Sequence, residues 1–150
     1  MRHERRKKGQ RGAAVVEFAV IAPLLLVLVF GIIEFSILLF DKAMITNASR
    51  EGARVGIVYR GPDTPRPSNA EIEQVVESYC EEHLISFDPA AELVIGIDPN
   101  DVASRTEGVS LTVTVTYPFR FLVFSNLLGL VGGGLADVLT LNAVTVMRME

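Results

Sequence analysis

The sequence predicts an α+β protein, in which a long N-terminal membrane-spanning helix precedes a small domain of one helix and a three-stranded antiparallel sheet. Three observations predict this class. Residues 13–40 are apolar over a length that can cross a bilayer. A later segment repeats apolar residues at helical spacing, and the C-terminal part alternates apolar residues with threonine and serine. With 150 residues, 49% of them hydrophobic, the chain has room for one domain and an appendage, which excludes a large two-domain enzyme.

The chain begins with a basic leader peptide, residues 1–12. Six Lys and Arg residues against the single acid Glu4 give the leader a charge of +5, and the overall charge of −4 leaves −9 on the rest. A basic run alone can bind nucleic acid. Here it adjoins an apolar segment, so we expect no nucleic-acid partner. Basic residues on this side alone predict that the N-terminus stays in the cytoplasm and that the chain after Phe40 lies outside the inner membrane.

The apolar segment, residues 13–40, is expected to be a single membrane span. A secretory signal peptide is the main alternative, but its apolar core is only about 7–15 residues long and ends at a small-residue cleavage site. The segment here is longer, and residues 41–44 supply no such site. Pro23 removes one helical hydrogen bond, which membrane helices tolerate.

Glu17 and Glu34 are the only ionisable residues of the span. A carboxylate at the centre of a bilayer costs about 2.5–3.5 kcal/mol on an insertion scale. We expect Glu34 to lie near the outer interface and to extend its carboxylate to water. Glu17 lies close to the inner end, where it either marks the interface among lipid headgroups or requires a positively charged partner.

No proline interrupts residues 41–58, so the N-terminal helix is expected to cover residues 13–58. Its 46 residues would measure roughly 69 Å, more than twice the hydrocarbon core. Ala48, Gly52 and Gly56 recur every fourth residue, a spacing that lets another backbone approach closely. They are candidate helix-packing residues, toward another subunit or toward the chain's own domain, and the sequence favours neither.

Residues 59–67 form a Pro/Gly-rich hinge, and residues 68–150 are expected to form an extracytoplasmic α+β domain. Ser68 and Glu71 have the spacing of a capping box, which predicts that a helix begins there and ends near Ser86. Its residues at helical spacing form one apolar stripe, namely Ile72, Val75, Val76, Tyr79 and Cys80.

Three segments are expected to form the sheet, residues 92–98, 109–117 and 138–149. The second alternates apolar residues with Ser and Thr, the period of a half-buried strand. Residues 121–136 are uncharged but contain four glycines, a poor composition for a second span. We expect them to fold over the sheet, with a position on the membrane surface as the alternative.

The residue types that carry catalysis or bind metals form no recognisable group. His3 and His83 are far apart in sequence and lack a nucleophile at motif spacing. Cys80 is the sole cysteine, which excludes an intramolecular disulfide and a thiolate metal cluster. Asp98–Asp101 lacks the EF-hand pattern and is expected to be a turn. We therefore expect no enzymatic activity, no cofactor and no metal site.

Two stretches near the N-terminus carry a resemblance. Residues 12–18, GAAVVEF, follow a basic leader and open an apolar helix, which resembles the processing site of type IV pilins and pseudopilins. Residues 11–35, followed by TNASREGAR at residues 46–54, are similar to the TadE-like family of minor pilins in tight-adherence pilus systems. The C-terminal segments 115–119 and 143–148 also look like that family.

The resemblance implies a pilin-like domain and cleavage by a prepilin peptidase between Gly12 and Ala13. It places Glu17 at the fifth mature position, where such pilins carry Glu, and gives Glu17 and Phe18 roles in processing and assembly. Cleavage would leave an ammonium at Ala13, one helical turn from Glu17. Pairing between this ammonium and Glu17, within a chain or between subunits, would offset the desolvation of both charges.

The implied function is that of a minor pilin or pseudopilin in the assembly of a tight-adherence (type IVb, Flp-like) pilus. Its expected location is the bacterial inner membrane, as a single-pass protein that can enter a surface pilus. Its expected partners are the prepilin peptidase, other pilins and pilus-assembly platform proteins. The alternative is an uncleaved, single-pass anchored extracytoplasmic binding module.

Overall fold

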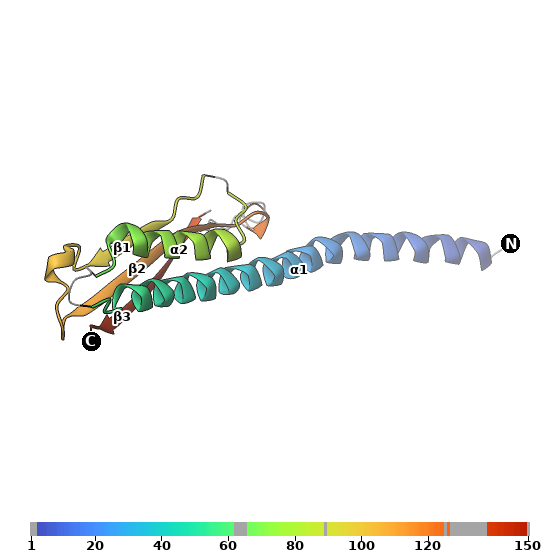
Figure 1. The fold of residues 1–150 in the computed structure, drawn as a ribbon. Coiled ribbons are helices and arrows are strands. Elements are labelled where there is room, and N and C mark those ends of the chain that lie inside the picture. The colour runs from blue at the N-terminus through green and yellow to red at the C-terminus, as the bar shows by residue number, and fades with distance from the viewer. Residues whose placement is uncertain (1–2, 62–65, 89, 125, 127–137, 150) are drawn as a thin grey trace. The chain divides into compact units, whose positions relative to one another are not determined.

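The computed structural model describes residues 3–61, 66–88, 90–124, 126 and 138–149. The order of elements confirms the α+β class: a long apolar helix, a second helix and a three-stranded antiparallel sheet (Figure 1). The chain divides into two compact units, residues 1–35 with 122–135, and residues 36–121 with 136–150. The elements are α1 (His3–Gly56), α2 (Asn69–His83), β1 (Val94–Asp98), the short 3₁₀ helix η1 (Val102–Ser104), β2 (Ser110–Arg120) and β3 (Val138–Arg148).

The first half of α1 presents apolar side chains to its surroundings. Every residue from Gly12 to Ile33 is exposed or half-buried, with Phe18 at 70% and Leu24 at 72% exposure. The helix reaches a mean hydropathy of 2.7 and is long and apolar enough to cross a membrane. It continues through Pro23 without a break. An apolar surface of this extent indicates a lipid or protein environment rather than water.

The second half of α1 has one buried face. Its buried residues follow one another at spacings of one, three and four, the signature of a single helical stripe. The helix starts at His3, ten residues before the expected start, and ends at Gly56, two residues before the expected end. The buried positions of this stripe are Leu38, Asp41, Ile45, Ala48, Ser49, Gly52, Ala53 and Gly56.

The sheet has the order β1-β2-β3, so β2 is central. Its alternate side chains from Leu111 to Phe119 are buried and form the core with the stripes of α1 and α2. β2 extends three residues beyond the predicted strand, through Pro118. Proline has no N–H for a second ladder, and β1 pairs only as far as Thr116, so Pro118 faces β3 alone.

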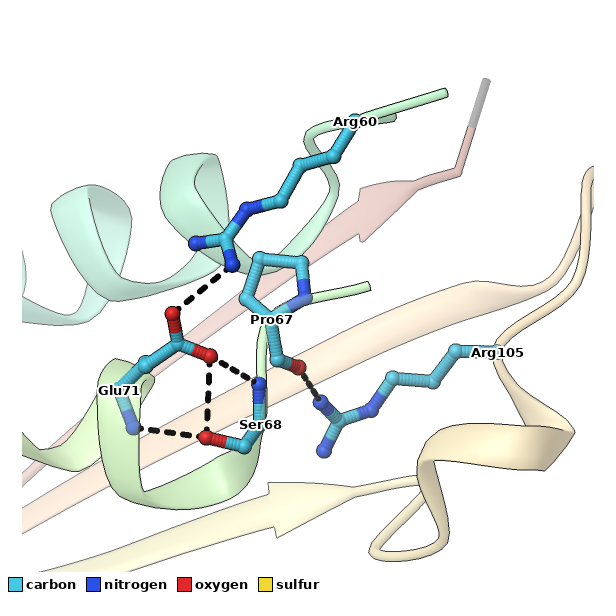
Figure 2. Close-up of polar contacts among 5 residues, drawn as sticks. All are labelled: Arg60, Pro67, Ser68, Glu71 and Arg105. Atoms are coloured by element: carbon cyan, nitrogen blue, oxygen red, sulfur yellow. Dashed lines mark hydrogen bonds and ion pairs between the residues drawn. The ribbon is translucent and has the colours of Figure 1, made fainter. Parts of the chain in front are cut away.

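The predicted capping box at the start of α2 is confirmed. Ser68 Oγ accepts the backbone N–H of Glu71 at 3.3 Å, and Glu71 Oε2 accepts the backbone N–H of Ser68 at 2.7 Å (Figure 2). The helix ends at His83, before the expected Ser86, because Leu84 is extended and donates its N–H to Cys80 O at 2.8 Å.

Arg105 has no role predicted from its sequence pattern, yet its side chain donates hydrogen bonds to three other residues of the domain. It is 2% exposed, and its Nη1 donates to Pro67 O at 2.8 Å (Figure 2). Pro67 is the last residue of the predicted hinge, which stays a prediction because its residues 62–65 lie outside the described residues. Arg105 Nε donates to Pro99 O at 3.0 Å, and its Nη2 donates to Asn69 Oδ1. The Asp98–Asp101 segment is the predicted turn, whose Asp101 caps η1 by accepting Ala103 N–H at 3.0 Å.

Candidate functional site

The residues predicted for processing lie together on the exposed stretch of α1. Gly12 and Ala13 are both exposed, and a methyl group added at Gly12 would meet no atom within 4 Å. Glu17 and Phe18 are also exposed, and no residue that the structure describes forms an ion pair or hydrogen bond with Glu17. The segment is thus sterically open around the predicted cleavage position. The roles of these four residues stay predictions.

Glu34 does not extend to water, contrary to our expectation. Its side chain is buried, with 4% exposure, and accepts backbone hydrogen bonds from a segment 90 residues away in sequence. Val123 N–H donates to Oε1 at 2.5 Å, and Phe124 N–H donates to Oε2 at 3.1 Å. The chain therefore supplies two donors to this carboxylate, and the sequence carries no local signal of such a long-range contact.

The contact at Glu34 also bears on the predicted loop, residues 121–136. Leu122–Phe124 lies on α1, where a methyl group added at Gly31 would be 3.1 Å from the Phe124 ring. This part was expected to fold over the sheet, and its position relative to the sheet stays a prediction. Residues 127–136 lie outside the described residues, so the expectation for them stays a prediction.

The ladder of small residues faces the chain's own domain. Ala48 is fully buried, and a methyl group added at Gly52 would be 2.5 Å from Val76 Cγ2 on α2. At Gly56 it would be 2.3 Å from Leu111 Cδ2 on β2 and 2.8 Å from Ile72 Cδ1 on α2. The sequence left open whether these residues pack against another subunit or against the chain's own domain. In the structure they pack against the chain's own domain, and the side chains of α2 and β2 lie too close to leave room for another backbone on this face.

Two polar groups of α1 also tie it to the domain. Asp41 is fully buried, and its Oδ1 accepts the backbone N–H of Ile85 at 3.0 Å, just after α2. Its Oδ2 has no hydrogen-bond partner among the described residues. Ser49 Oγ lies 2.7 Å from Thr145 Oγ1 on β3. Sequence reasoning missed both residues, because a lone Asp or Ser on an apolar stripe does not reveal its partner.

A cavity of about 470 Å³ opens beside α2, but its lining does not form a catalytic group. Cys80 is 3% exposed, and burial raises the pKa of its thiol to about 11, so the thiol stays protonated and unreactive at neutral pH. Burial also raises the pKa of Tyr117. Among the described residues, no three His, Cys, Asp or Glu side chains are arranged to hold a metal ion.

One segment of the chain matches a known protein family. A family model described as TadE-like protein matches residues 12–54, which confirms the N-terminal part of the resemblance found in the sequence. The segments 115–119 and 143–148 lie outside this match, so their resemblance stays a prediction. The match begins at Gly12 and ends at Arg54, so it covers the exposed stretch of α1 and most of its docking stripe. Searches of curated proteins and of solved structures return no match.

We predict that Gly52→Ala destabilises the domain although alanine favours helices. Overpacking costs about 1–3 kcal/mol, which exceeds the gain of about 1 kcal/mol in helix propensity. The Val76 side chain cannot easily rotate away from the added methyl group, because a β-branched side chain in a helix has one strongly preferred rotamer. Thermal unfolding of the detergent-extracted chain, followed by the near-ultraviolet signal of its tyrosines, measures the change. Arg50→Ala, exposed on the preceding turn, should unfold like the parent chain. An unchanged or raised midpoint for Gly52→Ala would contradict the tight docking.

Proposed function

We propose that the protein is a minor pilin or pseudopilin of a tight-adherence pilus, because residues 12–54 match the TadE-like family, which is associated with the assembly of such pili. A prepilin peptidase cuts it after Gly12. The family match carries the proposal, since it begins at the residue that precedes the cut. The open surroundings of Gly12 support it, because a peptidase needs access to the backbone there.

The proposed topology is a single pass through the bacterial inner membrane. The +5 leader keeps the N-terminus cytoplasmic, and the domain from Ser68 onward lies outside. The apolar side chains of α1 between Ala13 and Ile33 face lipid before assembly, and they provide a surface for other pilins afterwards. The prepilin peptidase and the pilus-assembly platform are the further partners in this proposal.

Glu17 supplies the proposed electrostatic contact of assembly. Its carboxylate is exposed on an otherwise apolar stretch, which suits a partner from outside the chain. The ammonium that cleavage creates at Ala13 has the matching charge. Two such charges in a low-dielectric site offset much of one another's desolvation only when they pair.

The alternative is an anchored extracytoplasmic binding module that keeps its leader. The continuous course of α1 from His3 through Gly12 is compatible with an uncut chain. The state of the N-terminus separates the two functions, because only the pilin is processed.

We predict that the native mature chain begins at Ala13. Intact-mass measurement of protein extracted from membranes should show the loss of residues 1–12. Gly12→Glu should leave the leader attached, because a charged side chain replaces the open position before the cut. Gly9→Glu introduces the same side chain within the leader and should still be cut. Recovery of residues 1–12 on the native protein would refute the pilin function and favour the anchored module.

We predict that a membrane-impermeant maleimide labels Ala70→Cys from outside the inner membrane. Ala70 is exposed on α2, whereas the parent chain should stay unlabelled because its only thiol, Cys80, is buried with a pKa of about 11. Labelling of spheroplasts before and after permeabilisation measures the orientation. Denatured parent chain, in which Cys80 reacts, is the positive control. Labelling of Ala70→Cys only after permeabilisation would invert the topology.

We predict that Glu17→Gln enters the membrane normally but assembles poorly. The neutral amide costs less to insert, so membrane levels should hold. Breaking a buried charge pair costs about 3–5 kcal/mol, which corresponds to a loss of association well above tenfold. Crosslinking of membrane fractions with other pilins measures this loss, and Glu82→Gln, on the exposed face of α2, is the matched control. Equal crosslinking of Glu17→Gln and the parent would show that Glu17 only marks the interface.

A further inference from the structure

The contact between Glu34 and the turn Leu122–Phe124 joins two apolar segments through one buried carboxylate. Two consecutive backbone amides, of Val123 and Phe124, donate to Glu34, and the Phe124 ring lies against Gly31 one turn earlier on α1. The turn is thereby fixed to one level of the helix. This contact is called the Glu34 clamp below.

The length of the apolar stretch sets the level of the clamp in a membrane. Ala13–Ile33 comprises 21 residues, which rise roughly 32 Å as a helix. The hydrocarbon core is about 30 Å thick. Glu34 is the first ionisable residue after Glu17, so it falls at the outer edge of the hydrocarbon when the stretch spans the bilayer.

The side chains around the clamp are apolar and face outward. Leu122 is 54% exposed on the turn, and Ile33 and Phe35 are 48% and 58% exposed on α1. They extend the lipid-facing surface of α1 without interruption up to the turn. The sequence from Phe121 to Ala136 contains no charged residue that would draw this segment away from the membrane boundary into water.

The hydrogen bonds of the clamp suit a place where water is scarce. A turn in water needs no protein acceptor for its amides, because water accepts their hydrogen bonds at no cost. At membrane depth, the backbone amides of a bend and of a helix start, such as those of Val123 and Phe124, must instead find their acceptors within the protein. A carboxylate there needs donors equally. Glu34 and the two amides satisfy one another, so both can approach the hydrocarbon.

We propose that Leu122–Phe124 is a second membrane contact of this chain, seated in the outer interface of the bilayer and held there by Glu34. The chain then meets the membrane through a span and a surface turn instead of through the span alone. The proposal rests on α1 as a membrane span, but it does not depend on cleavage or on pilus assembly.

The experiment measures the depth of a bimane fluorophore on the full chain in phosphatidylcholine vesicles. The fluorophore is attached at Leu122→Cys, at Leu26→Cys in the middle of the span, or at Val144→Cys, an exposed position on β3. Nitroxide lipids labelled near the headgroup or near the end of the acyl chain report lipid contact, and iodide reports contact with water. Cys80 remains in place, since its buried thiol does not take up the label.

We expect headgroup-level nitroxide to quench the label at Leu122 and iodide to quench it weakly. The label at Leu26 should respond to the deep nitroxide and the label at Val144 to iodide. Glu34→Ala leaves two amides without an acceptor, so the Leu122 label should lose its lipid quenching and gain iodide quenching. Glu51→Ala removes a half-buried carboxylate, paired with Arg54, from the same helix and should change nothing at Leu122. Protection of the buried Cys80 from the label in Glu34→Ala, as in the parent chain, shows that the domain stays folded.

Each of the other outcomes overturns one part of the proposals. Iodide quenching at Leu122 equal to that at Val144, with deep quenching at Leu26 intact, overturns the surface turn and leaves the pilin proposal standing. Protection of Leu122 from both lipid nitroxide and iodide overturns it as well, because the turn is then buried against protein. Lipid quenching at Leu122 that persists in Glu34→Ala overturns the role of Glu34. Loss of deep quenching at Leu26 overturns the span, on which both proposals rest.

Discussion

Close approach of α1 to α2 and β2 is the interaction on which the rest of the domain depends. At Gly52 and Gly56 the neighbouring side chains occupy the space that a methyl group would need. Only glycine allows this approach, which brings Ile72 and Val76 of α2 into contact with α1. Leu111 and Val113 of β2 are fully buried in the same core. The core is small, so contacts elsewhere in the fold cannot compensate for a looser fit between α1 and the domain. The long helix is therefore part of the domain's core and more than an anchor attached to it.

The surroundings of the same helix change along its length, as three of its acidic residues show. Glu17 lies on the exposed apolar stretch without a partner among the described residues. Glu34 is buried against two backbone amides of a distant turn. Asp41 is buried in the domain and holds the residue that follows α2 by its backbone N–H. The three carboxylates therefore lie in three different surroundings. Glu17 lies on the exposed stretch where a partner from outside the chain is proposed, Glu34 lies at the proposed membrane boundary, and Asp41 lies in a protein core.

Local patterns in the sequence predicted the elements well, because each depends on residues close together in the chain. The capping box at Ser68, the alternation in β2 and the apolar length of α1 are signals of this kind. The sequence did not predict Glu34, Asp41 or Arg105, whose partners lie 89, 44 and 38 residues away. A polar residue in an apolar stretch shows that a partner is needed, but not which amide or carbonyl provides it. The direction of the Ala48, Gly52 and Gly56 ladder was undecided for the same reason.

The lengthwise docking of α1 also has a mechanical consequence. The stripe from Leu38 to Gly56 lies parallel to the helix axis, and its contacts with the domain are distributed over five turns or so. A tensile load applied along the axis of this docked part of α1 therefore acts on the stripe in shear, and all of its contacts resist together. A load that peeled the helix away from one end would break the same contacts one at a time. Traction along the axis of the docked helix is thus the load that this arrangement of side chains resists best.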